Sequence, residues 1–224
     1  MTDFALARRN MIDGQLRPNR VTNIQILTAI ADLPRERFLP AGVQSMAYAD
    51  DDVPLGNGRY LMEPMILARL IQTLQPQPED KALVVASGAG YGTALLARLV
   101  KSVVALEADA TLAGSAEQTI KALGITNVQH VIGKMEAGVP VADGPYDVIL
   151  IEGAVQHVPP AIVDQLAEGG RLGTVIAGPS AGVLGLAQLI VKEGGVAAGR
   201  PIFDAGTPAL PGFAPPPRDR KSVV

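Results

Sequence analysis

The stretch of this chain with the clearest chemical character is a glycine-rich turn directly after a short apolar run. The run covers residues 82–86, and the glycines stand at positions 88, 90 and 92. Glycines let the backbone of a turn approach a ligand closely, and the first N–H groups of a following helix are free to bind it. Glu107 ends the next apolar run, 19 residues after Gly88. A doubly wound fold places an acid there to accept hydrogen bonds from the two hydroxyls of a ribose.

These residues predict a cofactor that contains a nucleoside, and they leave its identity open. Nicotinamide dinucleotides and S-adenosylmethionine both bind in this geometry. The alternative without a ligand is an ordinary turn between a strand and a helix, followed by a solvent-facing Glu107.

The composition removes several kinds of chemistry. The 224 residues include no cysteine and two histidines, which excludes thiolate catalysis, disulfides and cysteine-based metal sites and disfavours a multi-histidine metal centre. The 19 basic and 22 acidic residues give a net charge of −3 without a long basic run. We therefore expect no nucleic-acid partner and no binding to anionic membranes. We interpret the acidic run 50–52 as a solvated loop rather than a metal site.

One uncharged stretch is formally long enough to cross a membrane. Residues 172–191 contain no charged side chain, but Pro179 and four glycines interrupt them. We expect two buried strands joined by a turn at Gly178-Pro179 instead. The first ten residues lack the apolar core of a secretory signal. The sequence therefore predicts a soluble, cytoplasmic protein.

Apolar periodicity divides the chain into two parts. Up to Gln75 it is typical of helices, which we expect at 3–15, from 24 to the proline at 34, and at 64–74, with a loop at 50–60. Further along, we expect strands at 82–86, 102–106, 127–132, 146–151 and 171–177, and helices at 93–100, 111–123 and 160–166. Apolar strands that alternate with helices predict an α/β fold with a doubly wound, mostly parallel sheet and an N-terminal helical cap.

Short motifs in a fixed order add a resemblance to a known family. They are residues 9–17 (RNMIDGQLR), 33–40 (LPRERFLP), 47–50 (AYAD), 54–58 (PLGNG), 63–64 (EP), 88–91 (GAGY), 146–151 (YDVILI) and 168–172 (EGGRL). In this order and spacing the chain resembles the protein-L-isoaspartate O-methyltransferase family over nearly its whole length. The resemblance implies a Rossmann-like methyltransferase fold with a sheet of about seven strands, the last pair antiparallel. It also implies a repair activity that transfers a methyl group from S-adenosylmethionine to a protein or peptide carboxylate and leaves S-adenosylhomocysteine.

The same resemblance implies roles for residues and boundaries for domains. The cofactor's methionine part would face Ser87, Gly88, Ala89, Gly90 and Tyr91, its ribose Glu107, its adenine Lys134 and Met135, and the methyl group's path Glu152. The acceptor loop would contain Tyr60, Met62 and Glu63. We expect a cap and acceptor loop at 1–75, the methyltransferase domain at 76–212, and an irregular, proline-rich and basic tail at 213–224. We expect a monomer or a small homo-oligomer.

The chain departs from the family pattern at several of these positions. Val84 stands where the family usually has an acid, and Ala86 where it has the first glycine of the turn. Lys134 replaces an aspartate that would accept a hydrogen bond from the adenine amino group, which a charged lysine cannot do. Tyr60-Leu61-Met62 stands where the family usually has T-I-S, whose hydroxyls position the acceptor carboxylate. Glu63 adds a like charge beside that carboxylate.

These departures predict that isoaspartyl methylation is very slow. Methyl transfer to a carboxylate depends on in-line positioning rather than on acid–base catalysis, so lost positioning contacts lower its rate. The alternative function is a catalytically weak or inactive methyltransferase-like protein with a binding or regulatory role. Val84, Ala86, Lys134 and Met62 are the residues that favour this alternative.

Overall fold

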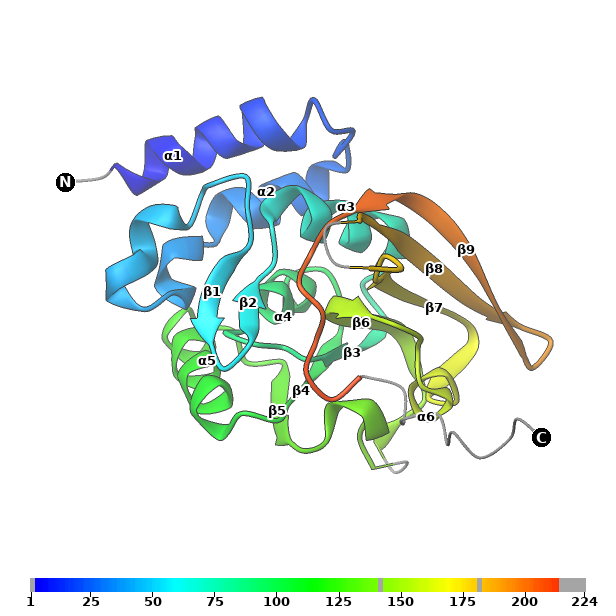
Figure 1. The fold of residues 1–224 in the computed structure, drawn as a ribbon. Helices are drawn as coiled ribbons and strands as arrows, with labels where there is room; N and C mark the ends of the chain where they lie inside the picture. The colour runs from blue at the N-terminus through cyan, green and yellow to red at the C-terminus, as the bar shows by residue number, and fades with distance from the viewer. Residues whose placement is uncertain (1–2, 141–142, 181–182, 214–224) are drawn as a thin grey trace, which may run out of the picture.

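The centre of the molecule is a twisted sheet, which Figure 1 shows among its covering helices. The computed structural model describes residues 3–140, 143–180 and 183–213. Within these residues the main sheet has seven strands in the order β5-β4-β3-β6-β7-β8-β9. The parallel strands are β3 (Lys81–Val85), β4 (Ser102–Glu107), β5 (Val128–Ile132), β6 (Tyr146–Val155) and β7 (Leu166–Ile176). The antiparallel strands are β8 (Gly185–Glu193) and β9 (Val196–Ala205). The predicted fold class is confirmed.

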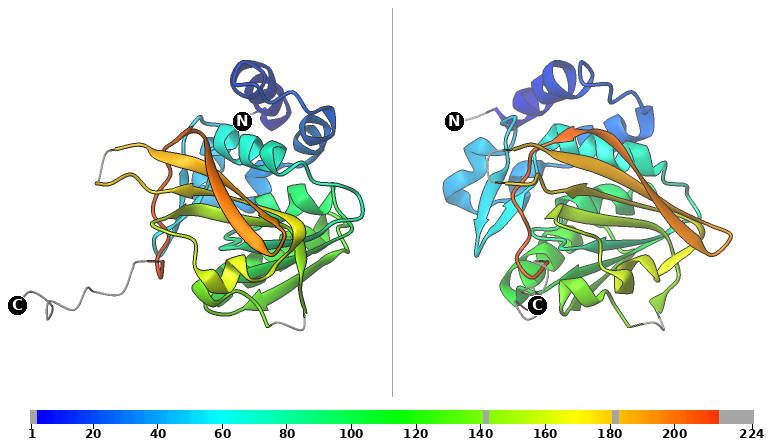
Figure 2. Two further views of the ribbon diagram at one scale, coloured as in Figure 1. Left: turned by 90° about the vertical axis from the view of Figure 1, so that its right-hand side faces the viewer. Right: turned by 45° about the vertical axis from the view of Figure 1, so that its right-hand side comes forward.

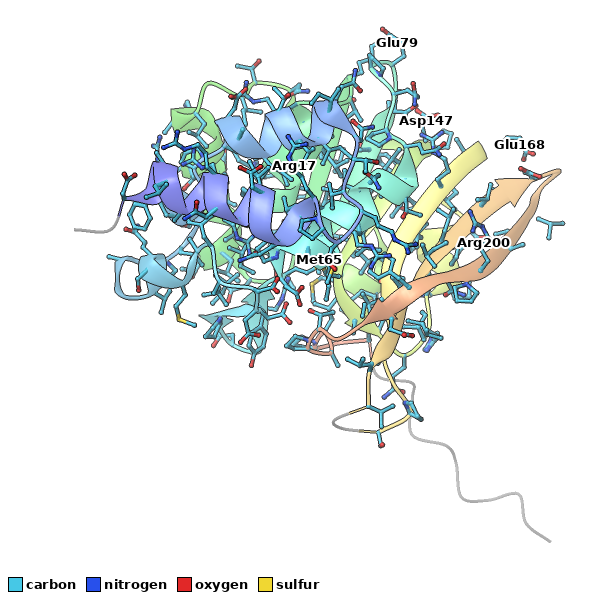
Figure 3. All side chains as sticks on the ribbon, turned by 90° about the horizontal axis from the view of Figure 1, so that it is seen from above. Arg17, Met65, Glu79, Asp147, Glu168 and Arg200 are labelled. Atoms are coloured by element: carbon cyan, nitrogen blue, oxygen red, sulfur yellow. The ribbon has the colours of Figure 1, made fainter. Side chains whose placement is uncertain are left out.

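Helices cover the sheet, and the N-terminal ones form the predicted cap. The α-helices are α1 (Phe4–Met11), α2 (Ile24–Asp32), α3 (Pro64–Leu74), α4 (Tyr91–Ala97), α5 (Ala110–Ala122) and α6 (Pro160–Val163). A π-helical turn, η1 (Ile12–Leu16), continues α1, and the 3₁₀ turns are η2 (Arg35–Phe38), η3 (Ala41–Met46) and η4 (Met135–Ala137). Figure 2 shows the cap on one side of the sheet and α6 on the other. Figure 3 looks down on the cap, with the strand that carries Arg200 extending away from it.

Local sequence signals set the starts of several helices. The side chain of Asn23 accepts hydrogen bonds from the backbone of Gln25 and Ile26 at the start of α2, and Asp109 plays the same part at the start of α5. Pro64 occupies the first turn of α3, where its missing N–H costs no helical hydrogen bond. These caps explain why the helix starts were predictable to within a residue or two.

Alternating residues of the parallel strands build two hydrophobic clusters, one on each face of the sheet. Val84 of β3 and Leu150 of β6 pack toward α1 to α4. Their neighbours Leu83 and Ile151 face the opposite cluster, which contains side chains from η4, α6 and the segment after β9. Because neighbouring strand residues point to opposite faces, a fully apolar strand is what a sheet covered on both sides requires.

The predicted loop at 50–60 is wrong, because this segment contains a β-hairpin. Its strands are β1 (Val53–Gly56) and β2 (Arg59–Leu61), paired antiparallel. Gly56, Asn57 and Gly58 all have positive φ angles, of 94°, 50° and 71°. Such angles suit glycine and asparagine and let the chain reverse within three residues.

Two other differences concern the second half of the chain. The helix predicted at 160–166 is a single turn, and β7 begins earlier than expected, at Leu166. The uncharged stretch 172–191 lies in β7 and β8, so the two expected strands are confirmed. No helix among the described residues has the length and apolarity needed to cross a membrane. The predicted tail falls outside the described residues from position 214 onward.

Candidate active site

The site assembles at the carboxyl ends of three adjacent strands. β3, at the centre, is flanked by β4 and β6, and the turn after β3 contains the predicted glycines. The backbone N–H of Gly88 donates a hydrogen bond to Oε2 of Glu107, at 2.7 Å. The structure therefore brings together the glycine turn and Glu107, which the sequence analysis assigned to one cofactor site. Carboxyl ends at a change in strand order are where doubly wound sheets bind ligands.

Glycine shapes this turn by packing as well as by backbone angle. Gly88 and Gly90 have φ angles of 53° and 90°. A Cβ atom on Gly90 would lie 2.9 Å from Cβ of Ala116 in α5. The turn therefore sits against α5, and only glycine allows that approach. Ala86, where the family usually has glycine, also has a positive φ, of 59°.

Glu107 forms a buried ion pair with Arg59 of β2. Nη1 of Arg59 lies 2.6 Å from Oε1 and 2.8 Å from Oε2. Its Nη2 donates to the carbonyl oxygen of Ala86, at 2.8 Å, and Nη1 also lies 3.3 Å from the Met135 sulfur. Glu107 is 1% exposed and Arg59 is 4% exposed. The acid predicted to hold a ribose is thus covered by an arginine of the same chain.

Backbone donors take up the remaining capacity of the Glu107 carboxylate. Oε1 accepts from the N–H groups of Ala108 and Asp109 at 2.9 and 3.1 Å, and Oε2 accepts from Gly88. A carboxylate offers about four lone-pair positions. With Arg59 on both oxygens, those positions are filled.

Two segments, the β1–β2 hairpin and the segment after β9, cover the carboxyl edge of the sheet. The tip of the hairpin is fixed by a hydrogen bond from the Asn57 side chain to the Asp109 carboxylate, at 2.9 Å. The segment after β9 runs beside the hairpin, as Figure 1 shows, and Pro211 Cγ would lie 3.3 Å from a Cβ atom on Gly58. This segment pairs with Ala154 of β6, which accepts from the N–H of Leu210 at 2.8 Å.

Glu152 is the second buried acid of the site. It lies in β6, and its Oε1 has no hydrogen-bond partner among the described residues. Burial raises the pKa of Glu152 to about 8, against the opposing influence of Arg59 and Arg35. At neutral pH this carboxyl group is mostly protonated. The hydroxyl of Ser87 is likewise buried without a partner in the described part of the chain.

Tyr91 and Ala89 of the predicted cofactor turn are buried in the structure. The Tyr91 ring lies beneath the guanidinium of Arg35, 4.8 Å from ring centre to Cζ, and packs edge-on against Phe38. Arg35 is itself fully buried and donates to the carbonyl oxygens of Ala47 and Met62, each at 2.6 Å. The Tyr91 side chain thus links the turn to the cap.

The three predicted acceptor-loop residues do not share one environment. Tyr60 is 38% exposed, whereas Met62 is 2% exposed and packs in the core. Glu63 is half-buried, and its N–H donates to a carboxylate oxygen of Asp52 at 3.0 Å. Burial, together with Asp50, Asp52 and Asp51, raises the pKa of Glu63 to about 7.

The two residues predicted beside the adenine, Lys134 and Met135, also lie in different environments. Lys134 is exposed at the N-terminal end of η4, whereas Met135 is buried with its sulfur beside Arg59. The roles predicted for the site residues stay predictions, because no ligand is present to test them.

Arg59, which fills the centre of the site, was not predicted from the sequence. A hairpin signal was available in the turn Gly56-Asn57-Gly58. Had the hairpin been predicted, the alternation along β2 would have placed Arg59 on the same inward face as Leu61. No local signal identifies its partner, since Glu107 is 48 positions away.

Known proteins resemble this chain over most of its length. A family model described as protein-L-isoaspartate(D-aspartate) O-methyltransferase matches residues 7–189. The protein-L-isoaspartate O-methyltransferase of Koribacter versatilis is 41% identical over 180 residues, which cover 80% of this chain and 80% of that protein. The Vibrio cholerae protein of the same name is 41% identical over 152 residues, 68% of this chain and 73% of that protein.

Solved structures agree with the sequence matches. A protein-L-isoaspartate O-methyltransferase with 26% sequence identity has a TM-score of 0.79, over 92% of this chain and 67% of its own. A Plasmodium falciparum structure in complex with S-adenosyl-L-homocysteine shares the fold, with 21% identity and a TM-score of 0.75, over 95% of this chain and 100% of its own. The family model spans most of the chain, and both curated relatives match more than two thirds of it. The chain therefore belongs to the protein-L-isoaspartate(D-aspartate) O-methyltransferase family.

Proposed function

We propose that this protein is an S-adenosylmethionine-dependent methyltransferase that methylates a carboxylate of a protein or peptide and is slow toward isoaspartyl acceptors. Family membership supports the reaction class. The observation that carries the proposal is the 2.7 Å hydrogen bond from Gly88 to Glu107. It sets the glycine turn and the acid side by side at the carboxyl edge of the sheet, where a nucleoside-containing cofactor binds in doubly wound folds.

The site fits the methionine part of the cofactor but not its ribose. The Ser87 hydroxyl and a Glu152 carboxyl oxygen are buried without a partner among the described residues. They lie in segments expected near the cofactor's methionine part, which carries polar groups able to pair with them. The ribose position does not fit as it stands, because Arg59 holds both oxygens of Glu107. The cofactor supplies the methyl group when bound.

The chain's own contribution to such a reaction is to position the acceptor. Asp52 accepts a hydrogen bond from the Glu63 N–H at 3.0 Å and another from the Thr207 hydroxyl at 2.9 Å. These bonds tie the end of the acceptor loop to the segment after β9. Met62 offers no hydroxyl for a carboxylate acceptor, and Glu63 is a second acid beside the path, which supports the slow rate that we propose.

A second candidate is a methyltransferase-like binding or regulatory protein without catalysis. The buried Arg59–Glu107 pair favours it, because a site that no longer binds the cofactor would still need a cation to neutralise Glu107. The cytoplasmic location and the monomeric or small homo-oligomeric state expected from the sequence stay predictions.

Calorimetry with S-adenosylhomocysteine and transfer of a labelled methyl group to an isoaspartyl peptide test the proposal. We expect measurable binding, and a transfer rate roughly 10²–10⁴-fold below that of the Vibrio cholerae relative. The range corresponds to two lost positioning hydrogen bonds of about 1.5–3 kcal/mol each. Turnover equal to the relative's would contradict the slow rate. Absence of cofactor binding, both in the parent and in a variant without Arg59, would favour the second candidate.

A further inference from the structure

We propose that Arg59 competes with the cofactor: its guanidinium occupies the ribose position at Glu107, and the β1–β2 hairpin must withdraw it before the cofactor binds. This inference rests on the proposed function. It assigns to Arg59 the role of a residue that sets cofactor affinity from within the chain.

The competition follows from the number of hydrogen bonds that Glu107 can accept. Its two oxygens accept from the N–H groups of Gly88, Ala108 and Asp109 and from Nη1 of Arg59. The backbone donors belong to the turn and to the strand end, so they stay when the site is occupied. The three backbone donors leave one of about four acceptor positions, on Oε2, for a hydroxyl donor of a ribose. Arg59 occupies that position, so a ribose hydroxyl can bind there only when Arg59 departs.

The closed arrangement has its own stabilising contacts. Arg59 also donates to the carbonyl oxygen of Ala86 at 2.8 Å, and Asn57 at the hairpin tip binds Asp109, two positions beyond Glu107, at 2.9 Å. A buried carboxylate without a cation is costly, so Arg59 compensates Glu107 when no cofactor is present. The cofactor therefore has to displace a favourable pair rather than enter an empty position.

The hairpin is built in a way that permits withdrawal. β1 and β2 form a two-stranded sheet of their own, separate from the main sheet. Gly56 and Gly58 flank the tip with positive φ angles, and a Cβ atom on Gly56 would meet no atom of the described residues within 4 Å. Nε of Arg59 is buried and has no partner among the described residues. A movement of the hairpin tip carries the Arg59 guanidinium away from Glu107.

The alternative interpretation is that the pair is a permanent structural element, and the two interpretations predict opposite effects of one substitution. A competitor lowers the apparent affinity in proportion to the fraction of molecules with Arg59 withdrawn. Its removal therefore tightens cofactor binding. Removal of a structural arginine would weaken cofactor binding if it disordered the site. It would leave binding unchanged if the site were closed to the cofactor in any case.

The test is calorimetric titration of S-adenosylhomocysteine into the parent chain, R59Q and R200Q. Glutamine removes the charge and keeps a polar side chain, and Arg200 is an exposed residue of β9, on the part of the sheet that Figure 3 shows extending away from the cap. We expect R59Q to bind at least tenfold more tightly than the parent, and R200Q to bind like the parent. Binding by R59Q that is equal to or weaker than the parent's would overturn the inference.

A second variant keeps the test decisive if R59Q folds poorly. N57G retains a residue suited to the positive φ at the hairpin tip but removes the hydrogen bond to Asp109. We expect it to bind S-adenosylhomocysteine about threefold more tightly than the parent, since it loosens the tip without touching Arg59. Unchanged or weaker binding by folded N57G would count against the inference. If no folded variant binds, the proposed cofactor fails together with the inference, whereas binding by the parent without a gain in R59Q and N57G overturns the inference alone.

Discussion

The carboxyl group of Glu152 lies against the backbone of Gly92, in the space that a side chain at that position would fill. A Cβ atom on Gly92 would come within 2.6 Å of the carboxyl carbon of Glu152. Gly92 lies in the first turn of α4, and Glu152 lies in β6. The third glycine of the turn is therefore needed for the packing of a buried acid. A glycine motif can thus reflect an internal contact as well as a ligand.

The burial of Glu152 predicts a pH-dependent stability. Its pKa rises from the ordinary glutamate value of 4.5 to about 8 in the folded protein, because burial disfavours the charged form. Between these values the folded state holds a proton that the unfolded state has lost, so unfolding becomes easier as the pH rises. The slope is at most about 1.4 kcal/mol per pH unit for one group. Urea unfolding of Glu152→Gln should show a smaller loss of stability between pH 5 and pH 8 than the parent.

The control for this measurement is Glu193→Gln, which removes an exposed acid at the end of β8. Its pH profile should follow the parent's, since an exposed acid has nearly the same surroundings before and after unfolding. Parallel profiles for the parent and Glu152→Gln would contradict the burial of a protonated carboxyl group at position 152.

The contact between Gly153 and Leu210 predicts a destabilising substitution at position 153. Gly153 has a φ of 149°, and a Cβ atom there would lie 2.5 Å from Cγ of Leu210. Gly153→Ala should push the segment after β9 away from β6 and lower the free energy of unfolding. We expect overpacking to lower the free energy of unfolding by about 1–3 kcal/mol, in addition to the cost of placing alanine at a positive φ.

Gly169→Ala supplies the matched control. Gly169 also has a positive φ, of 75°, but within the described part of the chain a Cβ atom there would meet nothing within 4 Å. It should cost only the backbone strain of about 1–2 kcal/mol. Chymotrypsin cleavage at Phe213, which is buried in the parent, should be faster in Gly153→Ala and unchanged in Gly169→Ala. Equal stability and equal cleavage of the two variants would contradict the packing role of Leu210.

The contacts of Arg35 predict that its substitution destabilises the cap. Its guanidinium spans the carbonyl oxygens of Ala47 and Met62, which lie on either side of the hairpin along the chain. Arg35→Lys cannot reach both oxygens and leaves one buried acceptor without a partner, at a cost of about 1–3 kcal/mol. Thermal or urea unfolding measures the loss. Arg37→Lys, at an exposed position of the same 3₁₀ turn, should change stability by less than about 0.5 kcal/mol, and an equal loss in both variants would argue against the role of Arg35.

The parallel sheet was predictable from sequence because its signals are local. Each signal determines the structure of residues close to it in the sequence. Such signals are the apolar strands, the glycines after β3 and caps such as Asp109. The position of Glu107 at the end of β4 followed from the same alternation and is confirmed. Its covering by Arg59 was not predictable, because the hairpin was interpreted as a loop and the pair joins residues 48 positions apart. The burial of Met62 likewise depends on tertiary packing against the cap.

Glu63 predicts how acceptor binding depends on pH, if the proposed carboxylate chemistry holds. Burial and the neighbouring Asp50, Asp52 and Asp51 raise its pKa to about 7. Below that pH the side chain is mostly neutral, and above it the negative charge repels a carboxylate acceptor. Two like charges about 4 Å apart in water repel by about 1 kcal/mol, or roughly fivefold in an equilibrium constant. The KM for an isoaspartyl peptide should therefore rise about fivefold between pH 6 and pH 8, with kcat less affected.

Glu63→Gln should abolish that rise, because glutamine keeps the shape of the side chain and cannot acquire the charge. Glu193→Gln again serves as the control, since position 193 is exposed at the end of β8, in a different sheet from the hairpin. The assay uses labelled methyl transfer at saturating cofactor, so that changes in cofactor affinity do not enter KM for the peptide. The same rise in KM for Glu63→Gln and the parent would show that the acid at position 63 does not face the acceptor. A fall in kcat at unchanged KM would instead place the effect of Glu63 on the reacting geometry, because uniform repulsion of a bound carboxylate raises KM alone.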